Sequence, residues 1–328
     1  MIANKTIFIS ALDWGLGHAT RCVPIIRNLE KDNKIIIGVT PLTRIIFDEE
    51  FPQTQKIDVP AYNIKYASVL PLWLKLLFDS AKISRIIKEE KKLLQKIISE
   101  NKIDIVISDN RFGLDSKSVK SIFITHQLFL KTPFANKILQ NLNEKYILKF
   151  DEVWIPDYED EAKSLSGALS HGKHFHSNVK YIGPQSRLLK PDQIEKKSDC
   201  LFLISGPEPQ QSIFKKLLIE RAKNYPGLKF AMVQPEQGAT NNKRAANPEI
   251  FISPSQKKLS ELICQSQKII CRSGYSTLMD LHFLENKQII LVPTPGQTEQ
   301  EYLAEYWKEK FGARVVLQKN IGALQMWE

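Results

Sequence analysis

The chain has 328 residues, of which 43% are hydrophobic, and a formal net charge of +10. This length and hydrophobic content are enough for a large core and predict two domains. The four cysteines show no C-x-x-C spacing, which argues against a disulfide framework and a zinc site and favours a reducing, cytoplasmic location. No apolar stretch approaches the ~18 residues of a membrane-spanning helix, and no signal-peptide pattern is found.

The excess positive charge is spread along presumed helix faces such as residues 82–102. No basic stripe is interleaved with exposed aromatic residues, so we expect no nucleic-acid partner. The apolar segment Leu70–Phe78 runs into these lysines, and an apolar patch beside cations is typical of proteins that rest on an anionic membrane surface. A buried core helix is the alternative for this segment, so peripheral association with the inner face of the cell membrane stays open.

The first predicted strand, residues 6–11, is followed by the turn GLGHATR and a helix. Free backbone N–H groups at such a turn favour anions, and an imidazole can move a proton near neutral pH. His18 is therefore our first candidate for catalysis, and Asp13 is the second candidate or the residue that orients His18. The alternative is a structural turn in which His18 caps or packs. The other turn residues, expected on the acceptor side, are Gly15, Gly17, Thr20 and Arg21.

This turn is not a dinucleotide fingerprint. The position of the third glycine is Thr20, and the next predicted strand, residues 34–40, ends without the acidic residue that would hold ribose hydroxyls. No G-K-[ST] follows the glycines, so the turn is not a P-loop either. The sequence predicts no nicotinamide or ATP site here.

Strands and helices alternate along the rest of the chain, which predicts parallel α/β layers. The remaining strands expected in the first half are residues 103–108, 121–125 and 152–156, with a long amphipathic helix at 80–100. We place an N-terminal domain at 1–183, a linker at 184–199 and a C-terminal domain at 200–328. The second half is predicted to contain strands at 200–204, 228–233, 249–253, 268–272, 288–292 and 314–318, separated by helices.

Small and polar residues lie at three strand ends of the second half. Ser205-Gly206 follows the first strand, Cys271–Thr277 closes the fourth and opens a helix, and Pro293–Gly296 follows the fifth. N–H groups and hydroxyls there could receive a phosphate at the positive end of a helix dipole. Asp280 could accept from ribose hydroxyls, and Gln300 could bind sugar hydroxyls. The alternative is that Ser273 is only a helix N-cap and Asp280 only a solvated helix residue.

Two stretches resemble GT-B glycosyltransferases. They are GLGHATR and CRSGYSTLMDLHFLENKQIILVPTPGQTEQEYLAEYW, and YIGPQSRL resembles the interdomain hinge. The nearest group is family 28, which includes the lipid-linked N-acetylglucosaminyl transferase of peptidoglycan synthesis. The resemblance implies an α/β protein of GT-B fold, with two Rossmann-like doubly wound domains facing a central cleft. It also implies a nucleotide-sugar donor in the second domain and a glycan or lipid-linked acceptor in the first.

The resemblance assigns roles by position. It places Ser273, Gly274 and Ser276 beside the diphosphate, and His18 opposite the reacting centre. Asp280 would contact the ribose, and Gln300 the transferred sugar. The donor-binding set is Ser205, Gly206, Arg272, Ser273, Gly274, Tyr275, Ser276, Asp280, Gly296, Glu299 and Gln300. The expected substrate is a UDP-sugar, and no cofactor is expected.

We expect direct displacement with inversion at the anomeric carbon, with His18 as general base. The helix start at 273–276 and Arg272 would stabilise the leaving diphosphate, so no metal is required. No D-x-D triplet stands out, and His171, His174 and His176 are taken as a plain loop despite their metal-like spacing.

Two other functions stay open, a nucleotide-sugar hydrolase and, as the third choice, a non-catalytic basic binding module. The UDP-sugar hydrolase of pseudaminic acid synthesis resembles this N-terminus, because it shares a glycine-x-glycine-histidine turn with a following arginine. In that case His18 activates water and no acceptor site is needed. The apolar insertion at residues 62–78 favours an acceptor, and therefore transfer.

Overall fold

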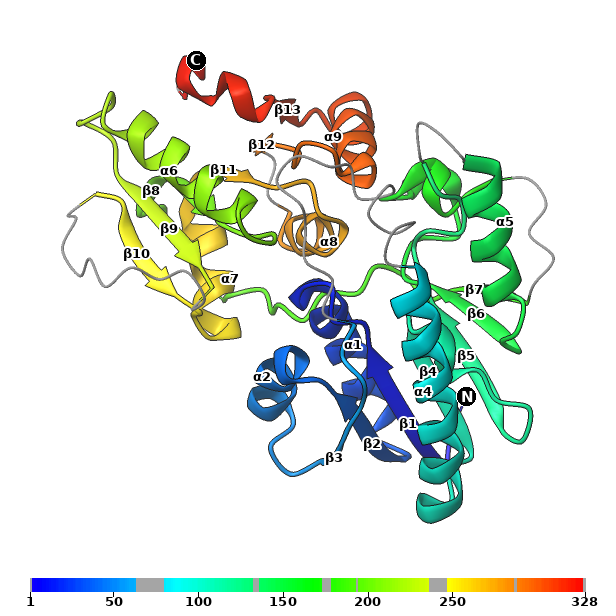
Figure 1. Cartoon of the computed structure of the whole chain (residues 1–328). Coiled ribbons are helices and arrows are strands. Elements are labelled where there is room, and N and C mark those ends of the chain that lie inside the picture. Colours follow the sequence, from blue (N-terminus) through cyan, green and yellow to red (C-terminus); the bar gives the residue numbers. More distant parts are fainter. Residues whose placement is uncertain are drawn as a thin grey trace. The chain divides into compact units, whose positions relative to one another are not determined.

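The computed structural model describes residues 2–62, 80–131, 136–172, 178–192, 194–235, 247–285 and 288–326. These residues form two compact units, of which the first ends at Ser186 and the second starts at Arg187 (Figure 1). The boundary falls within the linker range proposed from the sequence. The segment Leu70–Phe78 lies outside the described residues, as do His174 and His176.

The described part of unit 1 contains one seven-stranded parallel sheet in the order β3-β2-β1-β4-β5-β6-β7. Its strands are β1 (Thr6–Ala11), β2 (Lys34–Val39), β3 (Gln55–Asp58), β4 (Ile105–Asp109), β5 (Lys120–Ile124), β6 (Glu152–Ile155) and β7 (Val179–Tyr181). Successive strands are added on one side of β1 up to β3 and on its other side from β4 onward. The carboxyl ends of β1 and β4 therefore form a topological switch point, where ligands bind in such sheets.

Both faces of this sheet are covered by helices. Those in the described residues of unit 1 are α1 (Leu16–Leu29), α2 (Pro41–Glu50), α4 (Ser80–Asn101) and α5 (Asn136–Ile147). On β1, Ile7 and Ile9 belong to a buried cluster with α1 and α2. The alternate residue Phe8 belongs to a second cluster with Leu94 and Ile97 of α4. Successive side chains of a strand point to opposite faces, so this burial on both sides explains why β1 is a continuous apolar run.

Unit 2 repeats this arrangement with the order β10-β9-β8-β11-β12-β13, all parallel in the described residues. The strands are β8 (Ser198–Leu203), β9 (Phe230–Gln234), β10 (Glu249–Ile252), β11 (Ser266–Cys271), β12 (Ile289–Leu291) and β13 (Arg314–Val315). The helices are α6 (Gln210–Ala222), α7 (Gln256–Gln265), α8 (Tyr275–Phe283) and α9 (Thr298–Phe311). Its core joins Phe202 of β8, Phe214 and Leu218 of α6, and Ile321 near the end of the chain. The switch point lies between β8 and β11.

Most elements lie where the sequence predicts them, within a few residues. Among the α-helices and strands of the described residues, four were missed: α2, β3, α5 and β7. β7 has three residues, none of them buried, and its last residue, Tyr181, begins the stretch YIGPQSRL that was expected to form the interdomain hinge. The predicted last strand, 314–318, is shorter in the structure because β13 ends at Val315 and a 3₁₀ helix, η4 (Gln318–Ala323), begins soon after it.

Candidate catalytic and donor-binding sites

The turn that carries His18 starts at the switch point of unit 1. Ala11 at the end of β1 lies opposite Asp109 at the end of β4. Gly15 precedes the first residue of α1 and has φ +124°, a conformation that L side chains rarely adopt, so the turn needs glycine there. Thr20 donates its hydroxyl to the carbonyl of Gly17 at 3.0 Å, within the first turn of the helix. These local constraints bring His18 to the carboxyl edge of the sheet.

The imidazole of His18 binds the carboxylate of Asp109, with Nδ1 2.6 Å from Oδ1. Burial acts to raise the pKa of Asp109, but the charges and hydrogen bonds of Arg21 and His18 outweigh it and hold that pKa well below its usual range. The carboxylate is therefore ionised and can only accept, so this short contact places the proton of a neutral ring on Nδ1, even though Nη2 of Arg21 lies 2.9 Å from the same nitrogen. The lone pair is then on Nε2, which no described residue binds, and the His18 side chain is 19% exposed.

Arg21 has a different role from the one expected. Its side chain is 1% exposed, and Nε and Nη2 each lie 2.5 Å from a carboxylate oxygen of Asp109. Nη1 lies 2.8 Å from Nδ1 of His126. Arginine can only donate, so His126 accepts on Nδ1. The expectation that Arg21 faces the acceptor is therefore corrected: it is the buried counterion of Asp109.

Asp13 is also placed differently from the hypothesis that it orients His18. Both of its carboxylate oxygens accept from the backbone N–H of Tyr62, at 3.2 Å each. Asp109 instead contacts the His18 ring. Sequence reasoning missed Asp109 and His126, although each follows or ends an apolar strand at the carboxyl edge, which was the available signal.

In unit 2, the corresponding edge carries Ser205-Gly206 after β8 and the start of α8 after β11. Gly274 is the N-cap of α8 and has no side chain with which to cap the helix. At the start of α6, by contrast, the carboxylate of Glu208 accepts from the backbone N–H of Ser212 at 3.3 Å. The α6 N-terminus already has an acidic partner, so α8 is the better candidate for an anion.

Ser273 and Gln300 use their side chains inside the unit. The hydroxyl of Ser273 donates to the carbonyl of Gln300 at 2.7 Å. The side-chain oxygen of Gln300 accepts from the backbone N–H of Thr294 at 3.0 Å, and its amide donates to Gln297. These bonds hold the β12–α9 turn against the start of α8. The side chain of Gln300 therefore has a structural role in this turn, and its contact with the transferred sugar stays a prediction.

The same turn contains Gly296, which has φ +78° and donates its N–H to Glu301 at 3.0 Å. Glu299 in the first turn of α9 and Asp280 on α8 are half-buried. Tyr275 is buried at the first position of α8, and Ser276 beside it is half-buried. The sequence-predicted donor residues thus gather at the ends of β8, β11 and β12 in one unit.

Arg272 corrects a further expectation. Its side chain is about 1% exposed, and its Nη atoms donate to the carbonyls of Val292, Pro293 and Gln210 and to the side chain of Gln318. The ring of Phe214 lies 4.1 Å from the guanidinium carbon. It is a buried scaffold cation rather than an exposed diphosphate ligand. Burial lowers its pKa to about 10, so it stays charged at neutral pH, and no carboxylate of the described residues forms an ion pair with it.

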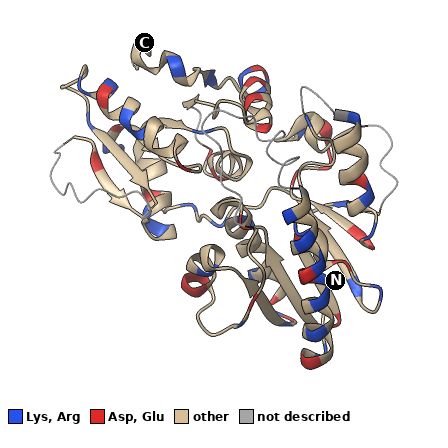
Figure 2. Ribbon diagram, in the orientation of Figure 1, with Lys and Arg blue, Asp and Glu red and all other residues tan. Residues whose placement is uncertain are grey.

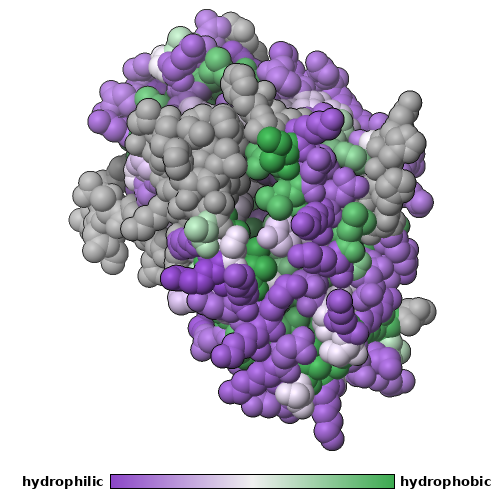
Figure 3. Space-filling model, turned by 45° about the vertical axis from the view of Figure 1, so that its right-hand side comes forward, coloured by the Kyte–Doolittle hydropathy of each residue, from purple (hydrophilic) through white to green (hydrophobic). Residues whose placement is uncertain are grey.

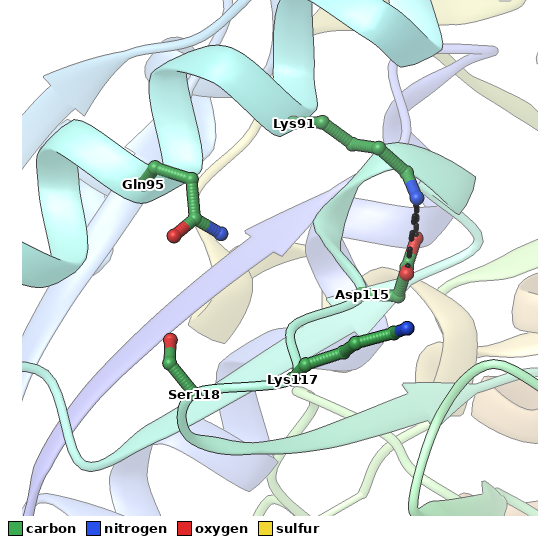
Figure 4. Close-up of a pocket in the computed structure, with 5 residues that line it drawn as sticks. All are labelled: Lys91, Gln95, Asp115, Lys117 and Ser118. Atoms are coloured by element: carbon green, nitrogen blue, oxygen red, sulfur yellow. Dashed lines mark hydrogen bonds and ion pairs between the residues drawn. The ribbon is translucent and has the colours of Figure 1, made fainter.

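Other polar features lie away from these edges. A hollow of about 300 Å³ opens between α4 and the loop before β5 (Figure 4). There Lys91 pairs with Asp115 at 2.9 Å, while Gln95 and Ser118 face the space. Ser118 comes just before the amino end of β5, so the hollow is at the opposite edge of the sheet from His18.

The surface of the described residues is largely hydrophilic on the face shown in Figure 3, with separate hydrophobic patches. Lysines and arginines follow one another along α4 (Figure 2). Among the described residues, no helix is both long and apolar enough to cross a membrane. The same residues contain no cluster of three or more His, Cys, Asp or Glu side chains suited to a metal ion.

Comparisons with known proteins agree with this architecture. Residues 227–326 match the glycosyltransferase family 28 C-terminal domain. No curated protein sequence matches the chain significantly. A spinosyn rhamnosyltransferase, SpnG, complexed with thymidine diphosphate, has a TM-score of 0.66 at 9% identity, with 97% of this chain and 90% of that chain covered.

Two further solved structures are similar to the chain. Phytolacca americana UGT2, complexed with UDP-2-fluoro-glucose and pterostilbene, has a TM-score of 0.63 at 12% identity, covering 95% of this chain and 85% of that one. MurG of Acinetobacter baumannii has a TM-score of 0.56 at 10% identity, covering 98% and 88%. At these identities the likeness shows the fold.

The two parallel sheets and these neighbours define the GT-B fold, as the sequence predicted. The family match lies in unit 2 and includes β11, α8, β12 and α9. The chain thus has the GT-B fold and is similar to glycosyltransferase family 28 in its C-terminal unit, which supports the enzyme class expected from the sequence.

Proposed function

We propose that this enzyme transfers a sugar from a UDP-sugar to a hydroxyl acceptor, with inversion and without a metal ion. The observation that carries the proposal is the His18–Asp109 pair, which leaves Nε2 at the switch point of unit 1 without a partner among the described residues. A general base must have a free lone pair within reach of the hydroxyl that it deprotonates. His18 meets the first condition through Asp109.

In the proposed reaction the acceptor oxygen attacks the anomeric carbon from the side opposite the diphosphate. As that bond forms, the hydroxyl proton moves to Nε2 of His18. The bond between the anomeric carbon and the diphosphate oxygen breaks, and the diphosphate leaves with the electron pair. A single displacement of this kind inverts the anomeric configuration.

The leaving group requires positive potential, and unit 2 supplies it. The N-terminus of α8 and the buried guanidinium of Arg272 both follow β11. Arg272 has no carboxylate partner among the described residues, so its charge is available to an anion at this edge even without contact. A diphosphate here would be stabilised in the way that a metal ion stabilises it in other transferases. UDP is proposed because UGT2 was solved with a UDP-sugar.

Asp280, one turn into α8, would accept hydrogen bonds from the ribose hydroxyls. The acceptor, a glycan or a lipid-linked or envelope hydroxyl compound, would be bound by unit 1. Transfer needs the sugar held by unit 2 to reach His18 of unit 1. We also propose that the protein acts at the inner membrane surface, with Leu70–Phe78 and the lysines of α4 as the contact.

The same base could activate water, which is the hydrolase alternative. The test is a panel of UDP-hexoses and UDP-N-acetylhexosamines, incubated with the protein alone and with lipid-linked and free glycan acceptors. Transfer predicts UDP release that requires an acceptor and an elongated product of inverted configuration. Free sugar at the same rate with and without acceptors would make the enzyme a hydrolase. Loss of turnover on adding EDTA, restored by a divalent cation, would contradict the metal-free mechanism.

A further inference from the structure

Unit 1 contains a second polar cluster that the proposed reaction does not use. Glu90 of α4 and Arg111, which follows β4, form an ion pair whose side chains are both 0% exposed. Arg111 Nη2 lies 2.8 Å from Glu90 Oε1, and Nε donates to the same oxygen at 2.8 Å. The other oxygen, Oε2, accepts from the hydroxyl of Tyr62 at 2.9 Å and the N–H of Gly113 at 3.1 Å.

Such a pair is costly to build for stability alone. Removing two charges from water costs several kcal/mol per ion, and an apolar pair of equal volume is often as stable. The full set of partners offsets this cost but also fixes the geometry, since every polar atom of Glu90 has a defined donor. The function of the cluster therefore has to be inferred from the chain segments that it holds in place.

The cluster holds three chain segments at the carboxyl edge of the sheet. Arg111 donates from Nη1 to the carbonyl of Ala11, the last residue of β1, at 3.2 Å, and from Nη2 to the carbonyl of Pro60. Tyr62, bound to Glu90 by its hydroxyl, donates its backbone N–H to Asp13. The turn between β1 and His18 is thus fixed at Ala11 and at Asp13.

The cluster also fixes Asp109 from the other side. Arg111 comes two residues after Asp109, and the hydroxyl of Ser108 both donates to the carbonyl of Arg111 at 2.7 Å and accepts from its N–H at 3.1 Å. The residue between them, Asn110, has φ +55°, so the chain turns sharply there. A shift of Arg111 would therefore move Asp109.

We infer that Glu90 and Arg111 are positioning residues that set the contact between His18 and Asp109 and thereby the tautomer of His18. The inference rests on the proposed function, because that contact gives His18 its free Nε2. Without the ion pair, Asp109 and the His18 turn lose a common anchor and the 2.6 Å contact loosens. A misplacement of about 1 Å at a reacting group can cost about 10²-fold in rate.

Three variants test this. Glu90→Gln removes the charge at nearly constant size, and Tyr62→Phe removes only the hydroxyl that binds Glu90. Glu152→Gln is the matched control, because Glu152 is another buried glutamate of unit 1, with Lys120 at 2.8 Å and Lys180 at 2.7 Å, and it lies at the amino end of β6. The readout is the His18 ring tautomer, from long-range ¹H–¹⁵N correlation spectra with resonances assigned by His18→Gln. This readout needs neither donor nor acceptor.

We expect the Nδ1–H tautomer in the parent protein and in Glu152→Gln, and a mixture of both tautomers in Glu90→Gln. Tyr62→Phe should show a smaller change in the tautomer populations of His18, in the same direction. If Glu90→Gln does not fold, Tyr62→Phe is the variant that tests the inference. Where turnover is measurable, Glu90→Gln should lower kcat by about 10- to 100-fold with the donor KM unchanged. An unchanged His18 tautomer in the folded Glu90→Gln or Tyr62→Phe variant would overturn the inference. If the tautomer shifts as expected but kcat is unchanged in His18→Gln, the inference would hold and the proposed function would be wrong.

Discussion

Replacing Asp109 with asparagine should abolish the base rather than merely weaken it. In the parent, the ionised carboxylate keeps the proton on Nδ1 of His18 at 2.6 Å. An asparagine amide can donate to Nδ1, which moves the proton to Nε2 and leaves no lone pair towards the acceptor. The same exchange at another histidine lowers kcat by about 10⁴-fold, or roughly 5 kcal/mol of barrier at 1.36 kcal/mol per factor of ten.

The substitution also removes the counterion of Arg21, whose side chain is buried. Breaking a buried pair in this way typically costs ~3–5 kcal/mol of stability, so a fall in Tm is expected as well. Asp157→Asn is the control, because Asp157 is fully buried and accepts from Ser164, Leu165 and Ser166, away from the His18 ring. We expect it to lower Tm and leave kcat unchanged.

The assay is UDP release from the donor that the panel identifies, measured below the Tm of each variant, with UDP affinity determined by calorimetry. Asp109→Asn should lose turnover while binding UDP like the parent. A variant that remains folded and retains kcat within about tenfold of the parent would refute the assignment of Asp109, since a reversed tautomer cannot be that active.

Three further outcomes are expected. Asp280→Ala should weaken UDP binding measured by calorimetry by about tenfold, equal to the ~1.4 kcal/mol of one good hydrogen bond, and unchanged affinity would remove Asp280 from the ribose site. Flotation with anionic vesicles should show binding that falls with added salt and is lost in the Trp73→Ala, Leu76→Glu double variant. Equal flotation of the parent and the double variant would mean that Leu70–Phe78 does not bind the membrane. Burial acts to raise the pKa of Glu152, but bonds to two lysines and a tryptophan lower it to about 2. The ionised Glu152 should therefore stabilise the fold above about pH 4.5, and this stabilisation should be lost as the pH falls towards 2. The Tm difference between the parent and Glu152→Gln should shrink over that range. A Tm difference that stays constant would contradict the ion pairs of Glu152.

The fold was largely predictable because its main signals are local. Continuous apolar strands such as residues 6–11 and the amphipathic α4 follow from side-chain periodicity, which a sequence displays directly. The resemblance in the C-terminal half then selected the GT-B arrangement. Short strands with little burial, such as β7, show no apolar periodicity in the sequence. They are strands only because they pair with a neighbouring strand in the folded sheet.

The sites were predictable only in part. The His18 turn was found because its glycines and histidine are adjacent in the sequence. The pairing of His18 with Asp109 spans 91 positions and depends on the register between β1 and β4, which periodicity does not give. Arg21 and Arg272 were assigned to ligands because each lies in a turn that opens a helix, whereas the packing buries both and gives them internal partners.

The central claim is that His18 is the general base, and His18→Ala tests it most directly. Turnover of the identified UDP-sugar, the calorimetric UDP affinity and the thermal midpoint should be measured on the same preparation. We predict a loss of about 10²–10⁴ in kcat, with UDP affinity close to that of the parent and a fall in Tm limited to the lost Nδ1 contact with Asp109, because Nε2 has no structural partner among the described residues. Turnover equal to that of the parent, or a loss fully explained by a lower Tm, would contradict it.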